Sequence, residues 1–440
     1  MGDLPDLIFR TGSSGPMSVP LQELAAARGR HEHRGIYSVC SAHPWVIEAA
    51  MRHAPIGNGP LLIEATCNQV NQFGGYSGMT PADFRERVWK IAAQVGFPRD
   101  RILLGGDHLG PYPWREHDAK EAMSHAVDMI RLFVREGFHK IHLDTSMSCA
   151  GDPNPLPEET IAKRAALLCS TAESSSEEHH PVYVIGTEVP TPGGAEKETA
   201  IAITSREGAE QAILTHRHAF AAAGLHAAWD RVIALVVQPG VEFSHESVTD
   251  YDPSHAESLC EVLRDHPRFV FEAHSTDYQR PRALAELVRD GFAILKVGPA
   301  LTFAMRQALF ALATIEEECL PPAQQSKLRA VIERVMLQQP DQWQKHYGGT
   351  LQEQHRLRVH SYSDRIRYYW TDPAVQQAVN GLVANLNACD IPETMLSDFL
   401  PAQYDKVREG TLKNAPLPII LDKIGGVLEP YIAACSGPAS

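Results

Sequence analysis

Two histidines and one glutamate of this chain could together hold a divalent metal ion. His108, Glu188 and His274 each lie at the end of a short apolar run. Two imidazoles and a carboxylate are a ligand set of catalytic Zn²⁺ sites, and they leave coordination positions open for a substrate. Glu272 stands two residues before His274, so both side chains face the same side of an extended strand. The alternative for any one of these histidines is a hydrogen-bonded residue of the core or of a loop.

Three carboxylates near the same run ends are candidates for proton transfer. Asp107 directly precedes His108 and would point the opposite way in an ideal strand, but a turn at the strand end could bring both inward. We expect Asp107, together with Asp144 or Glu242, to act as general acid or base on a substrate hydroxyl. The alternative for Asp107 and Asp144 is capping of their own loops, a common use of aspartate.

The end of the last apolar run suits an anionic group such as a phosphate. Gly298 permits a close approach of the backbone, and Pro299-Ala300 could start a helix whose free N–H groups face an anion. The alternative is that Gly298 and Pro299 only turn the chain. The residues expected to bind the substrate or its phosphate are Glu64, Asn68, Ser275, Thr276, Asp277, Lys296, Gly298, Ala300 and Arg365.

Two further segments carry groups that could bind a sugar or an anion. Residues 68–78 combine amides, glycines and Tyr76, which predicts either a mobile lid or an ordinary glycine-rich loop. In residues 361–370, Arg365 or Arg367 could reach an anionic substrate. The alternative for that segment is a helix that packs its aromatic face while the arginines stay solvated.

Eight short apolar runs must position all of these residues. They are rich in Val, Ile and Leu, which is typical of strands buried on both faces. Helix-like stretches separate them, several with a capping residue at the start and glycine at the end. The runs are 35–40, 60–66, 101–108, 140–146, 181–188, 231–240, 268–275 and 293–299, and the helical stretches include 81–95, 119–136, 157–170, 205–223, 255–265 and 281–290.

A strand followed by a helix, repeated eight times, predicts an α/β protein built as a (β/α)₈ barrel. An open, doubly wound parallel sheet is the alternative. We expect residues 1–320 to form the barrel and residues 321–440 to form a C-terminal helical extension packed on it. Active sites of such barrels form at the carboxyl ends of the strands, where the residues described above lie.

Composition and missing motifs exclude several classes of protein. The net charge of −14 argues against a nucleic-acid or acidic-membrane binder. No run approaches the 18 apolar residues of a membrane helix, no secretory signal is recognised, and the eight cysteines form no C-x-x-C pair, so a cytoplasmic protein with reduced thiols is expected. The phosphate loop of ATP-using enzymes, the G-x-G-x-x-G turn and the G-x-S-x-G elbow are all absent.

Several strings of the chain closely resemble the Z-type subunit of tagatose-1,6-bisphosphate aldolase. The resemblance spans about residues 30 to 430, and it implies a barrel that acts in carbohydrate catabolism. Members of this family are also named tagatose-6-phosphate kinases, a label that the missing nucleotide motifs do not support. The strings include EATCNQVNQFGGYSGMTPADF (64–84), GGDHLGP (105–111), KIHLDTSMSCAGD (140–152), GTEVPTPGG (186–194), QPGVEF (238–243), FEAHSTDYQ (271–279), LKVGPALTFA (295–304) and YSDRIRYYW (362–370).

The family is more distantly similar to the class II, zinc-dependent ketose-bisphosphate aldolases. That similarity implies that Asp107 is the general acid and that His108 lies on the metal. Those aldolases carry a further zinc histidine after the sixth strand, where this chain has Gln238, a weak zinc ligand. The expected cofactor is therefore a divalent metal, zinc or else manganese, and its expected ligands are His108, Glu188, His274 and Gln238.

Three functions follow from the resemblance. The first is metal-assisted retro-aldol cleavage of a ketohexose or its phosphate. The second is C4 epimerisation of such a ketose, in which the same bond is broken and remade. The third is a non-catalytic subunit that stabilises a catalytic aldolase chain. The expected partners are thus a ketose or ketose phosphate, a catalytic aldolase subunit, and further copies of this chain in a homo-oligomer.

Overall fold

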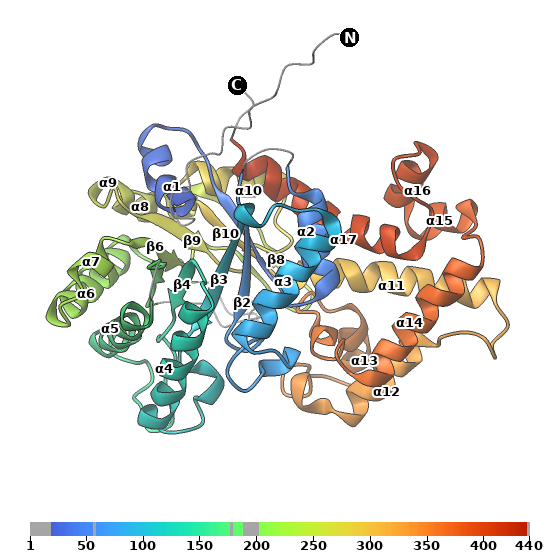
Figure 1. Ribbon diagram of the computed structural model, residues 1–440, viewed down its shortest axis with the longest axis horizontal. Coiled ribbons are helices and arrows are strands. Elements are labelled where there is room, and N and C mark those ends of the chain that lie inside the picture. Colours follow the sequence, from blue (N-terminus) through green and yellow to red (C-terminus); the bar gives the residue numbers. More distant parts are fainter. Residues whose placement is uncertain (1–18, 56–58, 177–178, 188–201, 438–440) are drawn as a thin grey trace, which may run out of the picture.

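The computed structural model describes residues 19–55, 59–176, 179–187 and 202–437 (Figure 1). Eight parallel strands close into a barrel in the order β1-β10-β9-β6-β5-β4-β3-β2. This confirms the predicted (β/α)₈ barrel, and the closed ring excludes the open sheet. The barrel strands are β1 (Ile36–Cys40), β2 (Leu61–Thr66), β3 (Ile102–Leu109), β4 (Lys140–Leu143), β5 (Val182–Ile185), β6 (Val232–Val237), β9 (Val270–Ala273) and β10 (Ile294–Val297).

A small antiparallel hairpin, β7 (Glu242–Phe243) with β8 (Val248–Thr249), lies between β6 and β9 along the chain. The remaining elements are helical. The α-helices up to the end of the barrel strands are α1 (Val19–Gly29), α2 (Pro44–His53), α3 (Pro81–Val95), α4 (Ala119–Arg135), α5 (Glu158–Ser175), α6 (Arg206–Ala222), α7 (His226–Trp229), α8 (Pro253–Cys260), α9 (Val262–Asp265) and α10 (Pro281–Arg289). The short 3-10 helices among the described residues are η1 (Gly75–Ser77), η2 (Arg99–Arg101), η3 (Tyr112–Trp114), η4 (Pro340–Gln342) and η5 (Arg365–Tyr368).

Local sequence signals account for the helices that surround the strands. Thr80 and Asp83 form a capping box at the start of α3, with Pro81 at the first helical position. Asp118 caps α4, and the buried residues of that helix recur at helical spacing, as in Ala122, Ala126 and Met129. These helices therefore begin where predicted, because their start signals are contained in a few neighbouring residues.

Helix α1 closes the end of the barrel opposite to the strand carboxyl ends. Its Leu21 and Leu24 belong to one apolar cluster with Leu62 of β2 and Val184 of β5, all within the barrel. This half of the barrel interior is filled by aliphatic side chains. Polar side chains are thereby confined to the other half, toward the strand carboxyl ends.

The chain after β10 forms a helical lobe beside the barrel and then returns to it (Figure 1). The helices of this part are α11 (Pro299–Cys319), α12 (Leu328–Gln338), α13 (Leu351–His360), α14 (Pro373–Ala388), α15 (Glu393–Phe399), α16 (Pro401–Arg408) and α17 (Pro416–Cys435). The division of the chain at residue 320 stays a prediction.

Helix α17 packs against α2, α10 and α11, so the last described helix completes the outer layer of the barrel. Its Tyr431 hydroxyl donates a hydrogen bond of 2.6 Å to the carbonyl of Thr276, in the loop after β9. The N–H of Gly35, just before β1, donates to the carbonyl of Cys435 at 3.1 Å.

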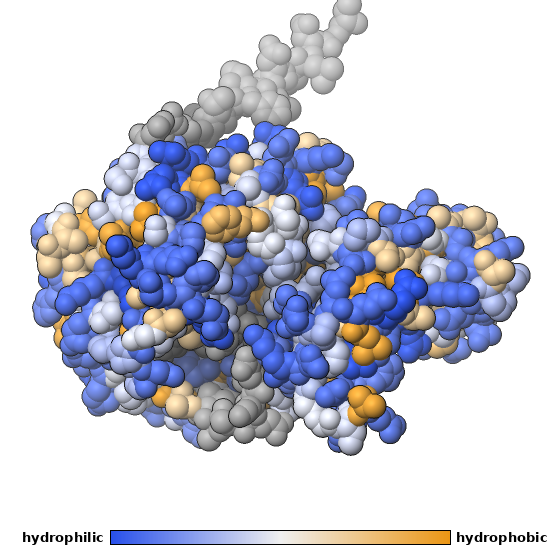
Figure 2. Space-filling model, turned by 90° about the horizontal axis from the view of Figure 1, so that it is seen from below, coloured by the Kyte–Doolittle hydropathy of each residue, from blue (hydrophilic) through white to orange (hydrophobic). Residues whose placement is uncertain are grey.

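The surface seen from below the view of Figure 1 is largely hydrophilic, with small separate hydrophobic patches (Figure 2). Within the described ranges, none of the helices is both long enough and apolar enough to cross a bilayer.

Two adjacent glycines in α17 test how closely this helix packs on α2. A Cβ atom at Gly425 would lie 2.0 Å from the imidazole of His53, whereas a Cβ at Gly426 would meet nothing within 4 Å. His53 is held by the carbonyl of Ala49 at 2.9 Å and by Asp422 at 3.8 Å, so it cannot move without losing both contacts. Gly425→Ala should lower the free energy of unfolding by about 1–3 kcal/mol. Gly426→Ala should raise it by about 0.5–1 kcal/mol, because glycine costs entropy inside a helix.

Urea denaturation of the two variants measures both values. Equal effects of the two substitutions would contradict this packing of α17 on α2.

Candidate active site

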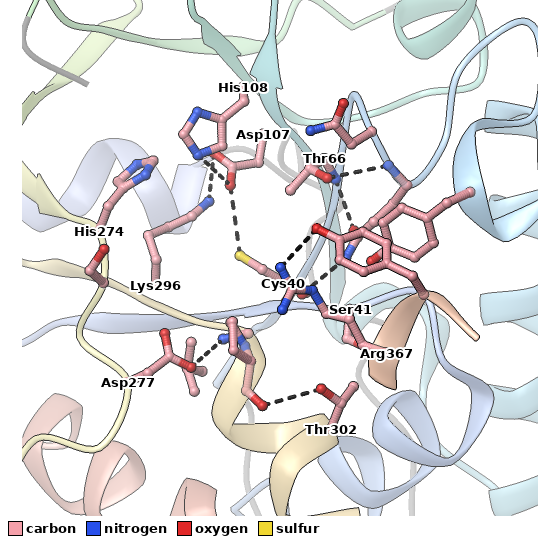
Figure 3. A pocket seen from close by; sticks show the side chains of 18 of the residues that line it. Cys40, Ser41, Thr66, Asp107, His108, His274, Asp277, Lys296, Thr302 and Arg367 are labelled. Carbon is pink, nitrogen blue, oxygen red and sulfur yellow. Dashed lines mark hydrogen bonds and ion pairs between the residues drawn. The ribbon is translucent and has the colours of Figure 1, made fainter. Parts of the chain in front are cut away.

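A pocket lies at the carboxyl ends of the barrel strands (Figure 3). Its volume is about 750 Å³, including the part open to solvent. Its wall contains eight of the residues expected from the sequence, and Glu188 lies outside the described residues. The eight are Asn68, Asp107, His108, His274, Ser275, Asp277, Lys296 and Gly298, and they are joined among others by Cys40, Ser41, Thr66, Tyr76, Thr302, Arg367 and Tyr368.

The floor of the pocket is a buried network of two lysines and three carboxylates. Lys296 points at Asp107, with 3.0 Å between Nζ and Oδ1, and also contacts Glu64 (Figure 3). Lys140 lies deeper, and its Nζ is 2.8 Å from both Glu64 Oε1 and Glu272 Oε2. The side chains of Lys140, Glu64 and Glu272 are fully buried. An unpaired charge buried here would cost a large free energy, so each charged group needs an oppositely charged partner.

Glycine on the neighbouring strand makes room for one of these carboxylates. A Cβ atom at Gly105 would lie 2.3 Å from Glu64 Oε1. Ser38, on the other side, donates a hydrogen bond of 2.5 Å to Glu64 Oε2. Glu64 thus belongs to the barrel interior beneath the pocket and contacts its lysines. It does not line the wall where substrate binding was expected.

Interactions with neighbouring charged groups keep Lys296 and Asp107 ionised. Burial opposes the charge of Lys296, but Asp107, Glu64 and Glu272 outweigh it and hold the pKa of Lys296 well above its usual range. Burial likewise opposes the charge of Asp107, but Lys296 and the nearby imidazoles hold the pKa of Asp107 well below its usual range. An ammonium that stays protonated is a poor nucleophile, so this arrangement disfavours an imine between Lys296 and a ketone.

Three imidazole rings meet beside this network. The ring centres of His108 and His274 are 4.8 Å apart, those of His108 and His142 are 5.2 Å apart, and those of His142 and His274 are 5.3 Å apart. All three side chains are buried. The chain thus gathers three histidines from β3, β4 and the end of β9.

A bulge in β3 lets two consecutive residues take part in the site. The register between β3 and β4 shifts between Gly106 and Leu109, and His108 has a φ of 50°, in the left-handed region. Ser275 after β9 has a φ of 53°. Non-glycine residues in this region are uncommon and are often found at functional sites. Because of the bulge, Asp107 and His108 both line the pocket, which an ideal strand would forbid.

Each of the three rings has one nitrogen beside a carboxylate. His108 Nδ1 is 2.8 Å from Asp144 Oδ2, His142 Nδ1 is 3.0 Å from Asp107 Oδ1, and His274 Nε2 is 2.9 Å from Glu272 Oε1. His142 Nε2 is buried and has no hydrogen-bond partner. Metal-binding histidines typically donate their other N–H to a carboxylate in this way. His142 Nδ1 also lies 3.2 Å from the backbone N–H of His108, so its contact with Asp107 is a donation only when Nδ1 carries the proton.

Four possible metal ligands lie close together at this site. One ligand atom each from Asp107, His142, Glu272 and His274 lie within 4.8 Å of one another. Burial lowers the pKa of His274 to about 4, so this ring is neutral near pH 7, as a metal ligand must be. The donor set therefore fits a divalent cation such as zinc, although Lys296 already neutralises part of the negative charge.

Four of the expected site residues have other partners. Gln238 Oε1 accepts from the N–H groups of Gly240 and Val241, at 2.8 and 3.1 Å, and so holds its own turn. Glu242 Oε1 accepts from the N–H of Phe243 at 2.9 Å. Neither side chain lines the pocket. A glutamine oxygen engaged by two backbone donors is unsuited to bind a metal, so the structure differs here from the expected ligand set.

The other two are Thr276 and Arg365. Thr276 donates its hydroxyl to the carbonyl of Lys296 at 2.6 Å, which joins the β9 end to β10. Arg365 donates to the carbonyl of Gln342, away from the pocket. The arginine that lines the pocket is Arg367. Asp144 is buried behind His108 and orients that ring, which differs from the direct role in proton transfer expected of it.

The expected phosphate site is filled by a side chain of the protein. Asp277 Oδ1 accepts from the N–H of Gly298 at 3.0 Å and from the N–H of Ala300 at 2.8 Å. These are the backbone groups at the start of α11 that the sequence offered to an anion. Gly298 and Ala300 thus bind an anion, but it is the carboxylate of Asp277.

Sequence reasoning missed Lys140 and His142, although β4 carried a signal for them. Lys140, His142 and Asp144 follow one another at intervals of two, so their side chains face one side of a strand. Three polar residues on one face of an otherwise apolar run indicate a polar barrel interior at that level.

The chain matches one family of proteins and resembles several proteins of known structure. A family described as "D-tagatose-1,6-bisphosphate aldolase subunit GatZ/KbaZ-like" matches residues 21–436. The crystal structure of a probable tagatose 6 phosphate kinase from Sinorhizobium meliloti 1021 is 50% identical, with a TM-score of 0.85, and covers 91% of this chain and 100% of that chain. Fructose-bisphosphate aldolase from Campylobacter jejuni is 14% identical, with a TM-score of 0.39, and covers 86% of this chain and 94% of that chain.

Substitution of Lys140 measures how much the buried network contributes to the free energy of unfolding. Lys140→Met should lower the free energy of unfolding by about 3–5 kcal/mol, because it leaves Glu64 and Glu272 without their shared cation. Lys406→Met is the matched control: its ammonium is 2.9 Å from Asp422 Oδ1 but is 35% exposed. Loss of that more exposed pair should cost about 1 kcal/mol or less. Guanidinium denaturation of both variants checks the difference, and similar costs would mean that the barrel interior does not depend on Lys140.

Proposed function

Because the chain belongs to the GatZ/KbaZ-like family of D-tagatose-1,6-bisphosphate aldolase subunits, we propose that its pocket breaks and forms the C3–C4 bond of a ketohexose or ketohexose phosphate with the help of a divalent metal ion. The observation that carries the proposal is the group of three buried imidazoles, each with one nitrogen beside a carboxylate. A structural core would bury apolar rings at this place more cheaply.

His142 and His274, which belong to the group of four clustered ligands, would hold the metal, with His108 as a third ligand from the ring that lies 5.2 and 4.8 Å from theirs. A bound Zn²⁺ or Mn²⁺ would polarise the C2 carbonyl of the ketose as a Lewis acid. The Nε2 of His142 is buried without a hydrogen-bond partner and lies in a ring beside those of His108 and His274, and this combination supports the assignment, since a bound metal would supply the missing partner. In this proposal His142 completes the set of three imidazole ligands and takes the role that was expected of Gln238.

The position of the carbonyl dictates which bond breaks. C4 of a 2-ketose is not adjacent to C2, so enolisation alone cannot change its configuration. Removal of the C4 hydroxyl proton turns C4 into an aldehyde, and the C3–C4 electron pair moves to form a C2–C3 double bond, giving the enediolate of the three-carbon fragment. Release of the fragments is aldolase activity, and rejoining to the other face of the aldehyde is C4 epimerisation.

Asp107 is the residue placed to move the proton. Its carboxylate lines the pocket and is held between Lys296 and His142, at 3.0 Å from each. Asp107 would accept the proton of the C4 hydroxyl; its low pKa makes it a weak base in that step and a ready proton donor when the bond re-forms. Lys296 would keep Asp107 oriented and would offset the negative charge that develops on the fragment.

A catalytic aldolase chain is the proposed partner, because the family description names a subunit. If this chain were only a stabilising subunit, it would raise the yield of a co-expressed aldolase without turning over a ketose. A homo-oligomer and a cytoplasmic location stay predictions.

Alanine substitution of two buried histidines, one inside and one outside the proposed metal site, tests that site. His142→Ala should hold less than about one tenth of the zinc of the wild-type protein after equilibration and dialysis, because ligand loss sharply reduces metal affinity. His216 is also buried with an unpartnered Nε2, but it lies on α6 and belongs to neither group of possible metal ligands among the described residues. His216→Ala should keep the full zinc content. Elemental analysis gives both values, and a His142→Ala protein with undiminished zinc would refute the assignment.

The reaction is tested by product analysis with D-tagatose, D-fructose and their phosphates in the presence of Zn²⁺ or Mn²⁺. Triose or triose phosphate would identify an aldolase, and a C4-epimeric ketose without cleavage would identify an epimerase. Asp107→Asn should reduce the rate by about 10²–10⁴-fold, since it removes the proton acceptor, and the zinc content of the same variant separates this role from that of a metal ligand. Turnover of none of these sugars by the metal-loaded protein would reject both enzymatic functions.

A further inference from the structure

The start of α11 presents its backbone donors to the pocket, and a carboxylate already uses them. Pro299 has no N–H, so the first donors of this 21-residue helix are those of Gly298 and Ala300. Both donate to the same oxygen of Asp277, at 3.0 and 2.8 Å. Asp277, Gly298 and Pro299 all line the pocket.

Phosphate binding at a helix start depends on free N–H groups and on the positive end of the helix dipole. Here both features stabilise the Asp277 carboxylate. Only 3% of Asp277 is exposed. The wall still offers hydroxyl groups, such as those of Ser41 and Ser275, but these carry no positive charge to offset the carboxylate. Thr276 donates its hydroxyl to Lys296 instead of facing the pocket.

The two cations of the described pocket wall, Lys296 and Arg367, already have partners within the protein. Lys296 is held by Glu64 and Asp107. Arg367 donates to the carbonyl of Ser363 and, at 2.9 Å, to the hydroxyl of Tyr368. A phosphate at the start of α11 would therefore meet the charge of Asp277, and Lys296 and Arg367 would have to give up these partners to bind it.

We propose that Asp277 is a specificity-determining residue that selects a free hydroxyl over a phosphate at the substrate end bound between β9 and α11. This inference rests on the proposed function, since it concerns the ketose bound in the same pocket. A carboxylate accepts a hydrogen bond from a sugar hydroxyl and repels a phosphate dianion. The ligand class that follows is a ketohexose with at least one unphosphorylated end, so a ketose 1,6-bisphosphate is excluded.

Burial raises the pKa of Asp277 to about 6, while the two backbone N–H groups oppose that rise. The group is thus mainly ionised at pH 7.5, and the repulsion is present under ordinary assay conditions.

Binding of inorganic phosphate by calorimetry at pH 7.5 tests the proposal in three proteins. The wild-type protein should show no binding at 10-fold the phosphate concentration that half-saturates Asp277→Ala, in which the two N–H groups are released. Phosphate bound to Asp277→Ala should compete with D-tagatose. Asp372→Ala is the matched control, because Asp372 caps α14 in the same way, at 2.8 Å from the N–H of Ala374, and does not line the pocket. It should gain no phosphate binding.

A second measurement needs no variant and so does not depend on how Asp277→Ala folds. The wild-type protein should bind D-tagatose at least tenfold more tightly than D-tagatose 1,6-bisphosphate. Tighter binding of the bisphosphate in competition with D-tagatose would overturn the proposal. A folded Asp277→Ala protein that gains no phosphate affinity, or an equal gain in Asp372→Ala, would overturn it as well.

The two proposals can fail separately. A protein that converts no ketose but shows this pattern of phosphate binding loses the proposed reaction and keeps the role of Asp277. A protein that converts the bisphosphate keeps the reaction and loses the role of Asp277.

Discussion

The pairing of buried lysines with buried carboxylates is the constraint on which the pocket depends. Lys140 and Lys296 link Glu64 on β2, Asp107 on β3 and Glu272 on β9, so five strands of a closed barrel meet at one charged layer. Below this layer the interior is aliphatic, and above it lie the imidazoles and the open pocket. The layer fixes the strand ends relative to one another, because any lateral shift would separate charges that have no water to replace their partners.

The same layer orients the groups proposed to do chemistry. Glu272 contacts Lys140 and also His274, and Asp107 contacts both Lys296 and His142. Each carboxylate thus neutralises an ammonium and positions an imidazole. Stability and function are coupled in this arrangement, since the carboxylates that hold the barrel interior together are within hydrogen-bond distance of the proposed metal ligands.

Much of the fold could be predicted because its signals are local. The capping box at Thr80 and the apolar run of β6 are each contained in a few residues, and they specify a helix start and a buried strand. The polar face of β4, with Lys140 and His142, was equally visible as an alternation of two. That part of the site was not predicted, because Lys140 and His142 lie within an apolar run and the predicted site residues lie at or after the ends of such runs.

Other parts of the site depend on contacts that no local pattern contains. That Asp107 and His108 both face the pocket depends on a bulge whose register is set by pairing with β4. The sequence could show that Gly298 and Ala300 offer an anion site. It could not show that Asp277, more than twenty residues earlier, already supplies the anion. The direction of the Gln238 amide was likewise undetermined, because it is fixed by the turn at Gly240.

The return of α17 to the barrel has a consequence for how the protein is made. Gly35 precedes the first barrel strand, yet its N–H is satisfied by Cys435 near the end of the chain. Tyr431 closes the loop after β9 in the same way. A ribosome must therefore synthesise the whole segment from Gly35 to Cys435 before this layer can be completed, and until then the surfaces of α2 and α10 that pack on α17 are exposed. Such long-range closure slows folding and makes the nascent chain dependent on protection from aggregation.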